Sequence, residues 1–121
     1  MNKINISRDS KCHIWDKSQP LTDDLLDALE VIKSYGEEDS HLIRKLKKCK
    51  TCGQLFFYEF YEKIDWVGGN DPQYRTWIPV ADQATADSLS KLAPIEILQF
   101  PRIIKDWPSE ATQPSPAQRI C

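Results

Sequence analysis

The residues best suited to chemistry in this sequence form a Cys-x-x-Cys-Gly turn, made by Cys49, Cys52 and Gly53. Two cysteines at this spacing can place both thiolates on one metal ion, and the glycine can take the positive φ that a tight turn requires. Because a tetrahedral zinc site needs four ligands, a zinc knuckle here would need two more. The sequence offers them only outside the turn, at Cys12, His13, His41 and Cys121.

Two other interpretations of the same turn stay open. The turn can be a bare β-turn without a metal, and the two thiols can form a redox pair. Redox Cys-x-x-Cys motifs usually lie at the N-terminus of a helix, whose dipole lowers the thiol pKa. Here an aromatic, strand-like run follows instead, which disfavours the redox interpretation.

A basic run precedes the turn, with five cations within residues 44–50: Arg44, Lys45, Lys47, Lys48 and Lys50. Such a run beside aromatic side chains can bind single-stranded nucleic acid. The formal net charge of −2 argues against a general nucleic-acid binder. We therefore favour a solvated edge strand whose lysines prevent sheets from pairing edge to edge.

Hydrolytic chemistry has little support, since the only two histidines, His13 and His41, lie in polar surroundings without a nucleophile motif. A protein-binding surface fits better, because Trp, Tyr and Arg dominate binding hot spots and acidic side chains attract a basic partner. Trp66 and Trp77 packed across a hairpin would give the same pattern without any partner. The candidate contact residues lie on a predicted helix and a predicted hairpin: Asp23, Asp24, Asp27, Glu59, Glu62, Asp65, Trp66, Asp71, Tyr74 and Trp77.

The pattern of apolar residues predicts an α+β domain, with an antiparallel sheet of three to four strands and two helices packed on it. Apolar residues at helical spacing predict a helix over 23–35, capped by Thr22 and ended by Gly36. Asp82 is predicted to cap a second helix, over about 83–92. The predicted strands are 42–48, 55–66 and 73–80, and the Cys turn joins the first two of them.

The segments outside these helices and strands give less specific predictions. Residues 95–104 are apolar and predict a short strand or helix that closes the core, and the Pro-containing tail from about 108 is expected to be irregular. A length of 121 residues predicts a single domain. We expect a cytoplasmic protein with reduced cysteines, because the start lacks the apolar core of a signal peptide and no stretch could span a bilayer.

The block at 49–80 resembles a family of small bacterial cytosolic proteins: Cys-Lys-Thr-Cys-Gly-Gln-Leu-Phe-Phe-Tyr-Glu-Phe-Tyr-Glu, followed by Gly-Asn-Asp-Pro-Gln-Tyr-Arg-Thr-Trp-Ile-Pro-Val. We associate that family with the immunity proteins of contact-dependent growth inhibition and related polymorphic toxin systems. The resemblance implies a non-enzymatic antitoxin that covers the active site of a cognate toxin domain, such as a nuclease. The alternative is a zinc-ribbon-like module that binds nucleic acid or a transcription component through residues 44–50.

Overall fold

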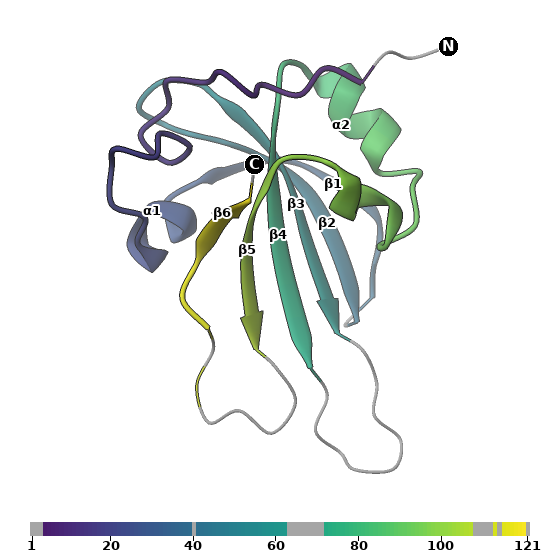
Figure 1. Ribbon diagram of the computed structural model, residues 1–121. Coiled ribbons are helices and arrows are strands. Elements are labelled where there is room, and N and C mark those ends of the chain that lie inside the picture. The colour runs from purple at the N-terminus through teal and green to yellow at the C-terminus, as the bar shows by residue number, and fades with distance from the viewer. Residues whose placement is uncertain (1–3, 40, 63–71, 108–112, 114, 121) are drawn as a thin grey trace.

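The protein is an α+β fold built on one six-stranded antiparallel sheet, shown by a computed structural model that describes residues 4–39, 41–62, 72–107, 113 and 115–120 (Figure 1). The strands follow one another across the sheet in chain order: β1 (Glu30–Asp39), β2 (Leu42–Lys48), β3 (Leu55–Glu62), β4 (Gln73–Val80), β5 (Arg102–Trp107) and β6 (Gln118–Ile120). The predicted fold class is confirmed, and the predicted count of three to four strands is too low.

The two strands that the sequence did not predict lie at the edges of the sheet. β6 forms within the tail that was expected to be irregular, and it pairs with β5. β1 replaces the second half of the predicted helix over 23–35. Helix α1 (Asp23–Asp27) begins where expected, with the side chain of Thr22 accepting a hydrogen bond from the backbone N–H of Leu25, but it contains only five residues.

Strand pairing explains why the helix stops early. Val31, Ile32 and Tyr35 are β-branched or aromatic residues, which favour strands, and the segment pairs along β2. Gly36 does take a positive φ, of 67°, but it does so where the register between β1 and β2 shifts rather than at a helix end. The prediction of a helix beyond Asp27 is therefore wrong, because sheet pairing outweighs the helical spacing of the leucines.

Each face of the sheet carries its own core. On the first face, Leu26 of α1 and the N-terminal residues Ile14 and Trp15 pack on Phe56 and Trp77. On the second face, α2 (Gln83–Leu89) and the 3-10 helix η1 (Glu96–Gln99) pack on the apolar side chains Leu46, Phe57, Ile78 and Val80. The predicted cap of α2 is confirmed, since the Asp82 carboxylate accepts a hydrogen bond from Thr85 N at 2.8 Å.

The two ends of the sheet are covered unequally. At the closed end, which contains the β2–β3 turn and the side chains of Phe56, Phe57 and Val80, both faces are buried. The open end contains Tyr61, near the end of β3, and Tyr74, near the start of β4. There the strands extend beyond both helices (Figure 1). The predicted strand residues 63–66 lie outside the described part of the chain. No helix in the described ranges is both long and apolar enough to cross a membrane.

Candidate metal centre

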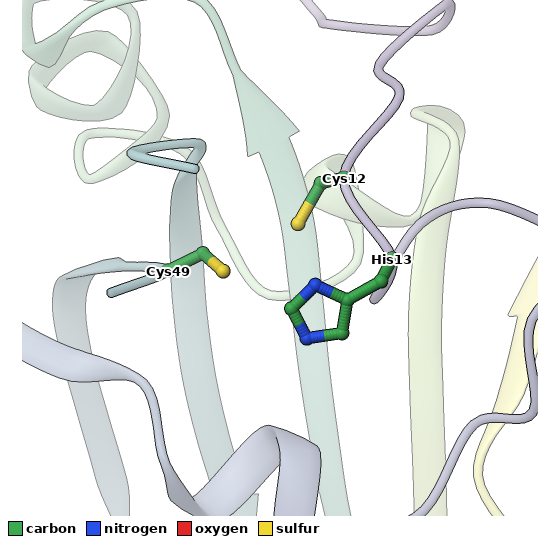
Figure 2. Close-up of side chains that lie close together, drawn as sticks. All are labelled: Cys12, His13 and Cys49. Carbon is green, nitrogen blue, oxygen red and sulfur yellow. The ribbon is translucent and has the colours of Figure 1, made fainter. Parts of the chain in front are cut away.

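Three side chains with metal-binding atoms converge at the closed end of the sheet, where the N-terminal segment passes the β2–β3 turn. The ligand atoms of Cys12, His13 and Cys49 all lie within 4.8 Å of one another. Figure 2 shows these side chains pointing into the same space from two separate segments. Cys12 and Cys49 are each only 3% exposed, and His13 is half-buried.

Cys52 supplies a fourth donor from the solvent side of the same turn. It is exposed, and its thiol is a hydrogen-bond partner of the thiols of both Cys12 and Cys49. The four residues Cys12, His13, Cys49 and Cys52 therefore lie close together and could bind a metal ion. Of the other ligands that the sequence left open, His41 lies far from this point, with its Nδ1 atom 3.0 Å from Glu62 Oε1. Cys121 falls outside the described residues.

The backbone of the turn fixes the direction of the Cys49 side chain. The N–H of Cys49 donates to the carbonyl of Gln54 at 2.9 Å, and the N–H of Gly53 donates back to the carbonyl of Cys49 at 2.8 Å. Gly53 has a φ of +83°, the left-handed conformation that was predicted for it. Cys49 itself follows the last residue of β2, so the sheet positions this thiol.

The N-terminal segment that carries Cys12 and His13 is anchored on both sides. Ser10 Oγ donates to Gln54 Oε1 at 2.7 Å, which ties the segment to the Cys turn. From β6, the guanidinium of Arg119 donates to the carbonyls of His13, Ile14 and Gln19. The adjacent Ile14 is 1% exposed, so its burial in the core also holds the segment in place.

The two buried thiols differ in acidity. Burial raises the pKa of Cys12 to about 12, with the thiols of Cys52 and Cys49 adding to the rise and a backbone hydrogen bond from Ile14 opposing it. Burial also acts to raise the pKa of Cys49, but the backbone N–H groups of Cys52 and Thr51 and the neighbouring thiols donate to its sulfur. The pKa of Cys49 is therefore lowered. The turn thus favours a thiolate at Cys49, which is the form that binds metals.

The acidic residues predicted to contact a partner fall into three groups. Asp23, Asp24 and Asp27 are exposed on α1, and Asp23 Oδ2 lies 2.6 Å from Lys105 Nζ. Glu62 lies at the open end beside His41. Glu59 is 3% exposed and its Oε2 accepts from Arg44 Nε at 2.8 Å, so its carboxylate belongs to a buried ion pair rather than to a contact surface.

The aromatic candidates are also divided. Tyr74 is 36% exposed at the open end, where its ring stacks with that of Tyr61 at a centroid distance of 6.2 Å. Trp77 is 4% exposed and packs against Tyr58, so it serves the core of the first face and is not available as a surface anchor. The remaining predicted contact residues, Asp65, Trp66 and Asp71, lie outside the described part of the chain.

The basic run over 44–50 does not form one surface, because alternation along β2 sends its side chains to opposite faces. Arg44 is buried on the second face, with a second hydrogen bond from Nη1 to the carbonyl of Ser90. Lys47 lies on the first face, with its Nζ 3.9 Å from the centroid of the Tyr58 ring, and burial lowers its pKa. β2 also pairs with strands on both sides, so the prediction of an edge strand is wrong.

One feature of the open end has no counterpart in the sequence prediction. A groove of about 530 Å³ lies on the second face, between the sheet and the segment 93–98. Its lining includes Tyr61, Tyr74 and Asp106. The segment was expected to close the core, but only Ile97 is buried there, while Ile95 is 78% and Leu98 is 44% exposed. The sequence contains Ile95 and Leu98, but it does not reveal that both side chains stay exposed beside a groove.

Comparisons of this chain with protein families, with curated proteins and with solved structures found no match.

Proposed function

We propose that the protein is a zinc-stabilised binding protein, which acts by holding a partner and not by catalysis. The observation that carries this proposal is the convergence of Cys12, His13 and Cys49 within 4.8 Å, with the Cys52 thiol beside them. Three sulfur donors and one imidazole are a ligand set of structural zinc sites. Four protein ligands fill a tetrahedral shell, so no open position is left for a substrate.

The proposed zinc ion acts on the fold. It would join the N-terminal segment to the β2–β3 turn, two parts of the chain that are distant in sequence. Zinc would bind the cysteines as thiolates and displace their protons, and its binding free energy would add to the stability of the folded state. Backbone N–H groups that already point at the Cys49 sulfur would stabilise the charge that stays on it.

Metal analysis and chelation test the zinc centre. The purified protein is expected to contain about one zinc per chain, and a strong chelator should lower its melting temperature by ten degrees or more, since structural zinc contributes to folding directly. Cys49→Ser should lose the metal and melt like the chelated protein. His41→Ser is the matched control, because His41 pairs with Glu62 at the opposite end of β2 from Cys49, and this variant should keep the metal and the native melting temperature. A protein that contains no metal, and whose melting temperature is the same with and without the chelator, would contradict the proposal.

For the partner we propose a toxin domain, bound in the cytoplasm. The support is the resemblance at 49–80 and the exposed carboxylates of α1, which would speed the encounter with a basic toxin such as a nuclease. Nucleic-acid binding through residues 44–50 has weaker support, because Arg44 is held in a buried ion pair.

Co-elution tests the partner. The protein and the toxin domain encoded beside it should leave a size-exclusion column as a one-to-one complex. The triple variant Asp23→Asn, Asp24→Asn, Asp27→Asn should slow association and flatten its dependence on salt, because long-range attraction is screened by ions. Separate elution of the two native proteins would contradict this choice of partner and leave the metal measurement unaffected.

A further inference from the structure

The groove on the second face has a floor made from three adjacent strands. Tyr74 of β4 lies in the middle of this floor. It is directly opposite Tyr61 of β3 on one side and Asp106 of β5 on the other. Side chains opposite each other in an antiparallel pair lie about 5 Å apart at Cβ, so one ligand group can touch a tyrosine ring and the carboxylate together.

The wall of the groove is preformed. Arg102 projects from β5 and its Nη1 donates to the carbonyls of Leu98, at 2.7 Å, and Phe100, at 3.2 Å. These bonds tie the segment 93–98 to the sheet. The wall then presents Ile95 and Leu98 to solvent, and large apolar side chains held at the rim of a groove are typical of binding sites.

Asp106 gives the groove its chemical preference. Its side chain has no hydrogen bond or ion pair within the described ranges, and burial raises its pKa, against the effect of the Arg102 charge. The Arg102 guanidinium is engaged with the carbonyls of Leu98 and Phe100 and forms no ion pair with Asp106 in the described part of the chain, so the carboxylate can still accept a donor from a ligand. The other carboxylate of the groove, Glu59, is already paired with Arg44.

We propose that this groove binds an arginine side chain of a protein partner, with the guanidinium on the Tyr74 ring and hydrogen-bonded to the Asp106 carboxylate. Guanidinium is planar, stacks on aromatic faces and donates in pairs to carboxylates, which suits a tyrosine and an aspartate placed side by side. The apolar wall would contact the residues that flank the arginine. The inference rests on the proposed binding function and names the chemistry of the partner's contact.

A peptide titration tests the groove without the natural partner. The probe is an acetylated and amidated pentapeptide, Ala-Leu-Arg-Leu-Ala, added to isotope-labelled full-length protein while backbone amide shifts are recorded. The arginine peptide should shift the amides of Tyr61, Tyr74 and Asp106. The same peptide with citrulline, which keeps the shape and loses the charge, should bind about tenfold more weakly, the size of one charge-assisted hydrogen bond.

Two variants and one control assign the binding to the named residues. Asp106→Asn and Tyr74→Leu should each bring the arginine peptide close to the affinity of the citrulline peptide. Asp9→Asn, which removes an exposed carboxylate from the N-terminal segment at the closed end, should change nothing. Equal binding of the two peptides, shifts outside the groove, or no shift at about 10 mM peptide would overturn the inference. None of these outcomes depends on zinc content or on co-elution with a toxin, so the groove and the proposed function can fail separately.

Discussion

The two ends of the same sheet differ in how completely they are buried. At the closed end, both faces are buried under α1, α2 and η1, and the Cys turn meets the N-terminal segment. At the open end, the same strands carry a half-exposed tyrosine pair and a groove. The difference indicates that stability is concentrated at one end, which leaves the other free to present side chains that the fold does not need.

A matched pair of substitutions on β3 gives the largest expected contrast. Phe57 and Tyr61 project from the same face, but Phe57 is fully buried at the closed end and Tyr61 is half-exposed at the open end. Phe57→Ala should lower the free energy of unfolding by about 4 kcal/mol, because it leaves a cavity in the core. Tyr61→Ala should cost less than about 1.5 kcal/mol. Denaturant titration measures both, and equal losses would remove the distinction between the two ends.

The Arg44–Glu59 ion pair lies between the two ends and gives the next effect. Arg44→Met should cost about 3 kcal/mol at neutral pH, since it leaves a buried carboxylate without its partner. The double variant Arg44→Met, Glu59→Leu should recover much of the loss, because no charge is then buried. A double variant as unstable as the single one would show that the pair acts through packing instead.

The pH dependence of Arg44→Met follows from the Glu59 carboxyl. Burial raises the pKa of Glu59 above its ordinary value of 4.5, and Arg44 opposes the rise. Without Arg44 the pKa rises further, so the folded variant binds a proton more readily than the unfolded chain. Proton binding at Glu59 therefore stabilises the folded variant. This stabilisation is fully present below the pKa that Glu59 has in the unfolded chain, and it is lost as the pH rises through the pKa of Glu59 in the folded variant. The deficit of the variant should therefore be smaller near pH 4 than at pH 7, and a deficit that grows on acidification would contradict this assignment.

Gly53 gives the smallest expected effect, at the closed end. No atom lies within 4 Å of a Cβ added there, so the cost of a side chain comes only from its φ of +83°. Gly53→Ala should cost about 1–2 kcal/mol, and Gly53→Asn less, because asparagine tolerates left-handed conformations. Thermal melts of the two variants give the comparison. Equal costs for alanine and asparagine would indicate that the strain is not local to this turn.

Local pattern was sufficient for the central strands. Alternating apolar residues predicted β2, β3 and β4, and Asp82 predicted the start of α2, because period and cap chemistry are local properties. The segment 30–39 was assigned wrongly, since its partner strand and not its own spacing decides its structure. Tertiary pairing of this kind cannot be derived from one window of sequence.

The candidate sites show the same limit. The Cys-x-x-Cys-Gly turn identified Cys49 and Cys52, but only the path of the N-terminal segment selects Cys12 and His13 over His41 as neighbours. The groove was not predicted at all, because Tyr61, Tyr74 and Asp106 come from three strands and meet only through the register of the sheet.

X-ray absorption at the zinc edge on the purified protein tests the central claim most directly, since it counts the atoms bound to the metal. The Cys12–His13–Cys49–Cys52 centre predicts three sulfur atoms at about 2.3 Å and one nitrogen at about 2.0–2.1 Å. Cys52→Ser should convert one sulfur into an oxygen or nitrogen ligand. A shell without sulfur, or a protein that holds no zinc after purification without chelators, would contradict the account.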